Sequence, residues 1–175
     1  MISILLVDDE PALLQACRLY LEDTGEYAVD TSLSAAEALI RVQQKSYDAI
    51  IADYEMPDMN GLEFLSIFRR CDPFPPFIIF TGRGREEVVI EALNNGADFY
   101  LQKGGDPKAQ FAELKSKVDH AIKQKHAEKI LEQERQQLLS IFDSLDQVVY
   151  VSDPKTYEIL YVNKSFQNFL GHDVI

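Results

Sequence analysis

The sequence predicts an α/β protein built on a doubly wound, five-stranded parallel sheet with the strand order 2-1-3-4-5. Two observations predict this fold. Short apolar runs alternate five times with amphipathic stretches over the first part of the chain, which is typical of parallel strands joined by helices. The apolar runs also lack the polar alternation of half-exposed strands, so helices are expected to cover both faces of the sheet.

The first two strand–helix pairs have clear boundary signals. Ile2–Val7 is an uninterrupted apolar run, and Asp9-Glu10-Pro11 after it opens a helix. Acidic residues favour the N-terminal end of the helix dipole, and proline is tolerated in the first turn. The second strand is expected over Tyr27–Thr31. Ser34 and Glu37 have the spacing of a capping box at the start of the second helix.

The other three pairs follow the same pattern. Each strand is a short run of apolar residues, and the dipeptide Asn95-Gly96 ends the fourth helix. Strands are expected over 49–52, 77–80 and 99–101, and helices after Gly61, over 86–94 and from about 107. In this strand order the first and third strands are neighbours at the point where the winding reverses, and ligands bind there, outside the carboxyl ends of the strands.

Composition and charge restrict the class of protein. The chain has 175 residues, is 46% hydrophobic and has a formal net charge of −12, as expected for a globular protein that does not bind nucleic acid. We expect no membrane segment and no signal peptide. Cys17 and Cys71 form no metal-ligand motif, and a reducing cytoplasmic location is expected. The glycosylation sequon at Asn163 is then a chance match.

Three aspartates are expected to meet at the carboxyl ends of the first and third strands. Asp8 and Asp9 follow the first strand, and Asp53 follows the buried run Ala49–Ala52. Carboxylates that share a crevice repel each other unless a cation joins them, and oxygen ligands in an acidic pocket suit Mg²⁺. The simpler interpretation is that Asp8 and Asp9 only cap the first helix, and both roles can coexist.

Thr81 and Lys103 follow the fourth and fifth strands. The hydroxyl can donate a hydrogen bond to a phosphoryl oxygen, and the ammonium can neutralise one. Either residue alone would usually be a solvated side chain. Because both are expected at the same edge of the sheet as the three aspartates, the combination indicates a phosphoryl site.

These motifs resemble the receiver domain of two-component response regulators, which has a flavodoxin-like fold. The resemblance covers about residues 1–122. It depends on VDDEP at 7–11, on Asp53, Pro57 and Gly61 in their D-x-x-x-P-x-x-x-G spacing, on Thr81, and on GADFYLQK at 96–103.

The resemblance implies a role for each site residue. Asp53 would take a phosphoryl group from the phosphohistidine of a histidine kinase or phosphotransfer protein. Asp9 and Asp53 would bind Mg²⁺ directly, Asp8 through water, and Glu55 through its backbone carbonyl. Thr81 and Lys103 would bind the phosphoryl oxygens. Thr81 and Tyr100 would act as the switch, with Tyr100 turning inward on activation.

Two further expectations concern the rim of the site. Receiver domains usually carry a proline after the lysine, in a cis bond, but this chain has Gly104. A cis bond before a residue other than proline costs about 2.5–4 kcal/mol, so a trans peptide is expected between Lys103 and Gly104. We also hypothesise that Glu55 and Arg83 pair across the pocket mouth and slow hydrolysis of the phosphate.

After the receiver domain we expect a helical linker over 123–145 and the start of a PAS-like domain over 146–175. The segments VVYVSD, EILYVN and SFQNFLG resemble the first strands and a helix of a PAS sensor domain, which would be incomplete at residue 175. Leu131, Leu138 and Leu145 are seven residues apart. The helix over 107–145 therefore forms either a coiled-coil homodimer or an amphipathic helix that packs on the next domain.

The leading functional prediction is a phosphoacceptor that switches a downstream sensor or kinase output, within a longer hybrid sensor histidine kinase or a separate regulator. It would catalyse its own phosphoryl transfer and slow dephosphorylation. One alternative is a receiver-like interaction module that takes no phosphate. A hydrolase of the haloacid dehalogenase type is disfavoured because VDDEP does not fit D-x-D-x-[TV], and a flavin-binding module is disfavoured because a phosphate loop is absent.

Overall fold

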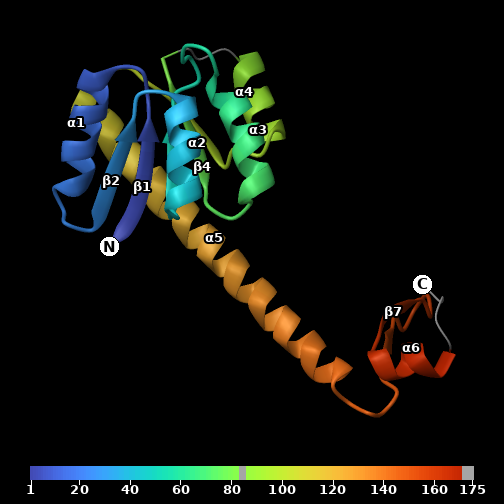
Figure 1. Ribbon diagram of the computed structural model, residues 1–175. Helices are drawn as coiled ribbons and strands as arrows, with labels where there is room; N and C mark the ends of the chain where they lie inside the picture. Colours follow the sequence, from blue (N-terminus) through green and yellow to red (C-terminus); the bar gives the residue numbers. More distant parts are fainter. Residues whose placement is uncertain (83–85, 171–175) are drawn as a thin grey trace. The chain divides into compact units, whose positions relative to one another are not determined.

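The computed structural model describes residues 1–82 and 86–170 and contains the five-stranded parallel sheet that the sequence predicts (Figure 1). The strands lie in the order β2-β1-β3-β4-β5. Their bounds are Ile2–Val7 for β1, Tyr27–Ser32 for β2, Ala49–Ala52 for β3, Phe77–Thr81 for β4 and Phe99–Gln102 for β5. The predicted bounds differ from these by one residue at most.

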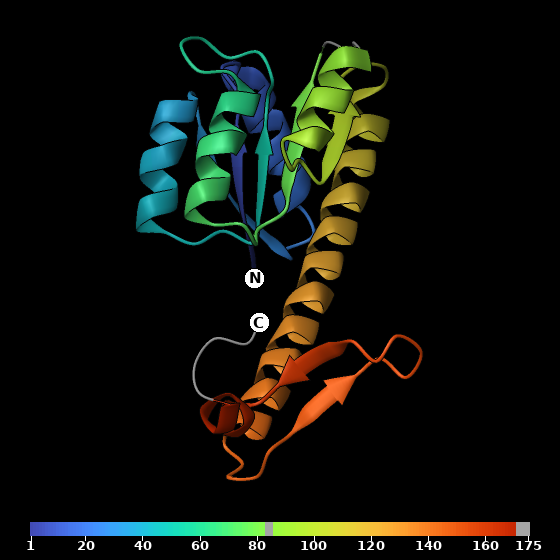
Figure 2. The same ribbon diagram turned by 90° about the vertical axis from the view of Figure 1, so that its right-hand side faces the viewer.

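Helices cover both faces of this sheet (Figure 2). On one face α1 (Pro11–Glu22) and the first part of α5 (Pro107–Asp143) bury Leu14, Cys17, Leu114 and other apolar residues against β1 and β4. On the opposite face lie α2 (Ala35–Gln44), α3 (Gly61–Cys71) and α4 (Glu86–Asn94). The carboxyl ends of the five parallel strands lie together at one edge of the sheet, where ligands bind in this topology.

Helix caps fix where two of these helices begin. The Ser34 side chain accepts a hydrogen bond from the Glu37 amide, which is one half of the predicted capping box, while the Glu37 carboxylate accepts from the Leu33 amide. At α3, Asn60 accepts from the amides of Leu62 and Glu63, while the Glu63 carboxylate accepts from the Asn60 amide. The capping box of Asn60 and Glu63 starts α3 immediately after the loop that follows Asp53.

The chain divides into two compact units, residues 1–126 and 127–175. The second unit contains the C-terminal part of α5, an antiparallel pair of strands and a short helix, with β6 over Tyr150–Ser152, β7 over Ile159–Val162 and α6 over Lys164–Leu170. Among the described residues, no helix combines the length and apolar character that a membrane span requires.

Candidate functional site

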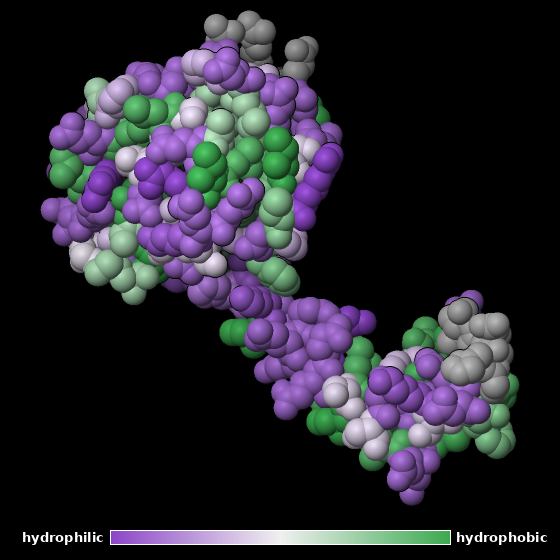
Figure 3. Space-filling view, viewed as in Figure 1, coloured by the Kyte–Doolittle hydropathy of each residue, from purple (hydrophilic) through white to green (hydrophobic). Residues whose placement is uncertain are grey.

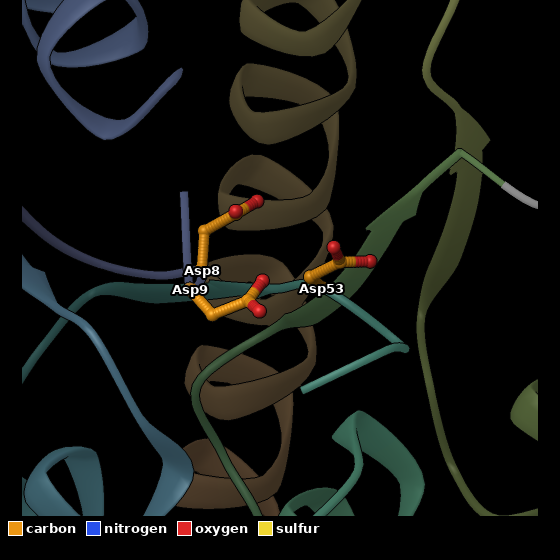
Figure 4. A group of neighbouring side chains, drawn as sticks. All are labelled: Asp8, Asp9 and Asp53. Atoms are coloured by element: carbon orange, nitrogen blue, oxygen red, sulfur yellow. The ribbon is translucent and has the colours of Figure 1, made fainter. Parts of the chain in front are cut away.

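The carboxyl ends of β1 and β3 bring three aspartates together (Figure 4). Because β1 and β3 are paired neighbours with Val7 opposite Ala52, Asp8 and Asp53 follow aligned positions, and the Asp53 amide donates to the Val7 carbonyl at 2.9 Å. One carboxylate oxygen from each of Asp8, Asp9 and Asp53 lies within 4.8 Å of the others. Asp8 and Asp53 are buried, whereas Asp9 is exposed.

Lys103, at the end of β5, supplies the positive charge of the cluster. Its ammonium nitrogen Nζ lies 2.6 Å from Asp8 Oδ2 and 2.7 Å from Asp53 Oδ2. The backbone of Lys103 is fixed by a hydrogen bond from its amide to the Thr81 carbonyl, at 2.7 Å. The two carboxylates therefore share one cation across strands that are far apart in the sequence.

Burial and charge pairing act in opposite directions on this cluster. Burial raises the pKa of the Asp8 carboxyl, although the hydrogen bond from Lys103 opposes the shift. Burial alone would lower the pKa of the Lys103 ammonium, but its hydrogen bonds to Asp53 and Asp8 outweigh burial and raise that pKa. Lys103 is therefore protonated at neutral pH and available to an anionic ligand.

The cluster opens into a pocket of about 640 Å³. Asp9, Asp53, Glu55, Thr81 and Lys103 line it together with Glu10 and Pro57, which belong to the sequence motifs, and with Tyr54, Met56, Asn60 and Gly82. Thr81 is 1% exposed at the end of β4. Thr81, Lys103, Asp9 and Asp53 therefore border one open space, large enough for a phosphoryl group, whereas Asp8 does not line it.

Tyr100 lies on β5, three residues before Lys103, and is not one of the residues that line the pocket. It is half-buried and packs against the apolar cluster beneath α2 and α3. Burial raises the pKa of its phenol, and the negative charge of Asp53 adds to the effect.

Gly61 shapes the loop that carries Asp53. A Cβ atom at position 61 would lie 2.2 Å from the Asp53 carbonyl oxygen and 3.1 Å from the Tyr54 Cα. The Gly61 amide also donates to the Tyr54 carbonyl at 2.9 Å. Only glycine permits this close approach, which returns the chain from the site to the start of α3.

The loop after Lys103 depends on glycine in a different way. Gly104 and Gly105 have φ values of 145° and 84°, which side chains other than hydrogen rarely allow. All described peptide bonds are trans, as expected for the bond between Lys103 and Gly104. The structure does not test the expected pair of Glu55 with Arg83, because Arg83 lies outside the described residues.

Sequence reasoning missed the direct ion pair between Asp8 and Lys103. Asp8 was expected as a metal ligand through water or as a cap of the first helix. Its Oδ2 atom instead accepts a hydrogen bond from Lys103, and its Oδ1 atom accepts one from the amide of Glu10, the N-cap residue of α1, at 3.0 Å. The order of the strands places the ends of β1, β3 and β5 at one edge of the sheet, but the contact itself depends on the side-chain conformations of Asp8 and Lys103.

Family comparisons cover both parts of the chain. The model of the response regulator receiver domain family matches residues 4–115, and the PAS domain model matches residues 136–175. Response regulator Rre1 of Synechocystis is 36% identical over 108 residues, which are 61% of this chain and 47% of Rre1. SaeR of Staphylococcus aureus is 35% identical over 108 residues, which are 62% of this chain and 46% of SaeR. The chain thus spans about half the length of these relatives.

Solved structures support the same relationship. A response regulator receiver domain protein from Clostridium thermocellum has a TM-score of 0.65 and 29% identity, over 73% of this chain and 98% of that one. TrrA from Thermotoga maritima, solved in complex with Mg²⁺ and BeF, has a TM-score of 0.61 and 32% identity, over 69% and 99% of the two chains. This chain belongs to the response regulator receiver domain family, and a segment that matches the PAS domain family follows its receiver.

Proposed function

We propose that Asp53 accepts a phosphoryl group from the phosphohistidine of a histidine kinase or phosphotransfer protein, with Mg²⁺ as cofactor. The observation that carries this proposal is the position of Asp53, which is 6% exposed, lines an open pocket and touches the Lys103 ammonium. An Asp53 oxygen attacks phosphorus, the bond from phosphorus to the histidine nitrogen breaks, and the nitrogen leaves with the electron pair. The product is an aspartyl phosphate.

The donor set fits a magnesium ion. Three carboxylates with oxygens within 4.8 Å of one another offer only hard oxygen ligands. Asp9 and Asp53 would hold the ion directly, the Glu55 carbonyl would be the third protein ligand, and Asp8 would bind through water. When bound, Mg²⁺ neutralises charge on the phosphoryl oxygens.

Lys103 and Thr81 complete the phosphoryl site in this proposal. The Lys103 ammonium leaves its hydrogen bond with Asp53 and binds a phosphoryl oxygen, while Asp8 continues to accept a hydrogen bond from it. Thr81 donates its hydroxyl to another phosphoryl oxygen. Movement of Thr81 then lets Tyr100 turn inward, and the surface formed by α4, β5 and α5 is remodelled. Attack of water on the aspartyl phosphate returns the site slowly to its resting state.

We propose that this change passes from the receiver, over 1–122, through the linker, over 123–145, to the PAS-like segment, over 146–175. Leu131 and Leu138 are 68% and 57% exposed on α5, which favours a weak homodimer through the 107–145 helix. Sedimentation velocity with and without beryllofluoride tests the dimer. Identical distributions at every concentration, unaffected by Leu131→Glu or Leu138→Glu, would exclude a dimer switch.

The proposed partner of the receiver is a histidine kinase or phosphotransfer protein rather than a nucleic acid, given the acidic net charge of −12. Cys17 and Cys71 are free thiols, which fits a reducing cytoplasmic location. The chain would act either in a separate regulator or in a longer hybrid sensor kinase.

Phosphorylation by acetyl phosphate tests the proposal. Intact-mass analysis should show one added phosphoryl group on the wild-type chain in the presence of Mg²⁺ and none after chelation. Asp53→Asn should abolish the added mass, whereas the control Asp58→Asn, at an exposed aspartate five residues further on, should retain it. Full phosphorylation of the Asp53→Asn variant would show that Asp53 is not the phosphoacceptor. A wild-type chain that takes no phosphate would favour the interaction module, and turnover of a phosphate ester would favour the phosphatase.

A further inference from the structure

Asn163 is the one buried polar residue among the described residues of the second unit. It lies between the end of β7 and the start of α6, and its side chain is 0% exposed. The only other buried residue in 127–170 is Val162, at 5% exposed. A buried amide is stable only when its donors and acceptor are satisfied, so its partners show what holds this region together.

The Asn163 amide group joins three segments. Its nitrogen Nδ2 donates to the carbonyl of Phe142, in the last turn of α5, at 3.0 Å, and to the carbonyl of Gln147 at 2.8 Å. Its oxygen Oδ1 accepts from the Val149 amide, just before β6, at 2.9 Å and from the Phe166 amide, in the first turn of α6, at 3.1 Å. One side chain thus connects the end of α5 with the start of β6 and of α6.

Further hydrogen bonds reinforce the same connection. The Tyr161 hydroxyl of β7 donates to the Asp143 carboxylate at 2.9 Å, and the Lys164 amide donates to the same oxygen at 3.1 Å. The Ser165 hydroxyl donates to the Leu145 carbonyl at 2.6 Å. The bonds from Ser165 and Asn163 satisfy carbonyls at and beyond the C-terminal end of α5, where a helix lacks partners of its own.

Apolar packing is too sparse to make this connection by itself. The described rings here include Phe142 and Tyr161, with centroids 6.2 Å apart, and Tyr150 and Phe166, with centroids 6.0 Å apart. All four side chains remain partly or largely exposed. Directional hydrogen bonds therefore determine the geometry between the end of α5 and the two strands.

We propose that Asn163 is a positioning residue that makes the end of α5, the loop 144–149 and the β6–β7 pair move as one body. The position requires a planar amide because carbonyl acceptors surround the nitrogen, Phe142 and Gln147 within 3.0 Å and Leu145 at 3.5 Å, and two amide donors bind the oxygen. An aspartate would lose the donors, and an apolar residue would lose both functions. The consequence for signalling, that a change along α5 reaches the strands through this joint, rests on the function proposed above.

Hydrogen exchange on the full chain tests the joint directly. In Asn163→Ala, the amides of Val149 and Phe166 and those of the loop 144–147 should exchange about tenfold faster than in the wild type. The first two amides lose their acceptor, and the loop loses the donor that binds its Gln147 carbonyl. The matched control is Asn168→Ala, because Asn168 lies exposed on α6. In this control, Val149, Phe166 and the loop 144–147 should all exchange at the wild-type rate.

Asn163→Asp separates the two halves of the amide, and circular dichroism checks that each variant keeps its helix. The carboxylate retains the acceptor, so the amides of Val149 and Phe166 should stay protected. The loop 144–147 should exchange faster because its carbonyls lose their donor. If the loop 144–147 exchanges at the wild-type rate in both Asn163→Ala and Asn163→Asp, the proposed role of Asn163 is wrong, whatever the phosphorylation state.

The same experiment with Mg²⁺ and beryllofluoride measures transmission. In the wild type, exchange should change both near Asp53 and over 147–170; in Asn163→Ala, the change near Asp53 should remain and the change over 147–170 should disappear. An undiminished response over 147–170 in the variant would overturn the proposed joint. If exchange near Asp53 does not change when Mg²⁺ and beryllofluoride are added, the result counts against the proposed function. The positioning role of Asn163 is then tested by the exchange rates measured without beryllofluoride.

Discussion

The receiver and the segment after it obtain their order in opposite ways. In residues 1–126 two apolar clusters cover the faces of a parallel sheet, and the site is built from side chains at its edge. In the described residues 127–170 only Val162 and Asn163 are buried, and Figure 3 shows apolar residues at the surface there. The difference suggests that packing holds the receiver site in place, whereas hydrogen bonds at one asparagine hold the end of the linker.

Truncation of two leucines on α5 should give the largest difference in stability between the receiver and the segment after it. Leu114 is 0% exposed in the receiver core, and Leu131 is 68% exposed. Leu114→Ala should lower the free energy of unfolding of the receiver by about 3 kcal/mol, because it leaves a cavity in a packed core. Leu131→Ala should leave it unchanged. Urea denaturation followed by circular dichroism measures both, and equal losses would contradict the contrast.

Gly61 tests whether the backbone under the site is as tightly packed as the core. Gly61→Ala should cost about 2 kcal/mol, since its Cβ would meet the Asp53 carbonyl oxygen at 2.2 Å and that contact is with backbone. The control is Gly82→Ala, where a Cβ meets nothing within 4 Å. Urea midpoints of the two variants would show the difference, and a Gly61→Ala variant as stable as the control would mean that the loop after Asp53 relaxes freely.

Substitution of Arg69 and Arg135 compares the contribution of a partly buried ion pair in the first unit with that of an exposed ion pair in the second. Arg69 is 16% exposed, lies 2.7 Å from Asp98 and also donates to the carbonyls of Gly96 and Pro75. Arg69→Met should lower receiver stability by about 2 kcal/mol because buried acceptors lose their donor. Arg135 is 63% exposed beside Glu132, so Arg135→Met should cause no measurable change. Thermal unfolding of each variant provides the measurement, and a comparable loss for Arg135→Met would show that the linker contributes more than its exposure indicates.

The effect of magnesium on the stability of residues 1–126 should be smaller than the effects of the destabilising substitutions above. At a Mg²⁺ concentration ten times the dissociation constant, linkage predicts a gain of about 1.4 kcal/mol in the free energy of unfolding. Asp9→Asn should reduce this gain, since Asp9 is one of the three clustered carboxylates. Hydrogen exchange would assign the gain to residues 1–126, and equal protection over 127–170 would show that the ion acts elsewhere.

The sheet and the positions of the site residues could be predicted because both follow from local patterns and one topological rule. Apolar runs define the strands, and parallel strands of this order place Asp8, Asp53, Thr81 and Lys103 at one edge. The contact of Lys103 with Asp8 could not be predicted with the same certainty, because it depends on side-chain rotamers 95 residues apart.

The role of Asn163 could not be predicted for a related reason. In the sequence Asn163 is notable for its match to a glycosylation sequon and as the last residue of the PAS-like run EILYVN, whereas in the fold it is buried and bonded on both sides of its amide. Its partners are the ends of helices and strands separated by irregular loops, and periodicity gives no information on loop geometry.

The central claim is that Asp53 carries the phosphate, and chemical trapping tests it most directly. Borohydride reduces the acyl phosphate of an aspartate to homoserine, so the full chain is phosphorylated with acetyl phosphate and Mg²⁺, reduced, digested and sequenced by tandem mass spectrometry. The account predicts homoserine at position 53 and at no other aspartate, and none when Mg²⁺ is chelated. Homoserine at Asp8 or Asp9 with none at position 53, or a phosphorylated chain without any homoserine, would contradict it.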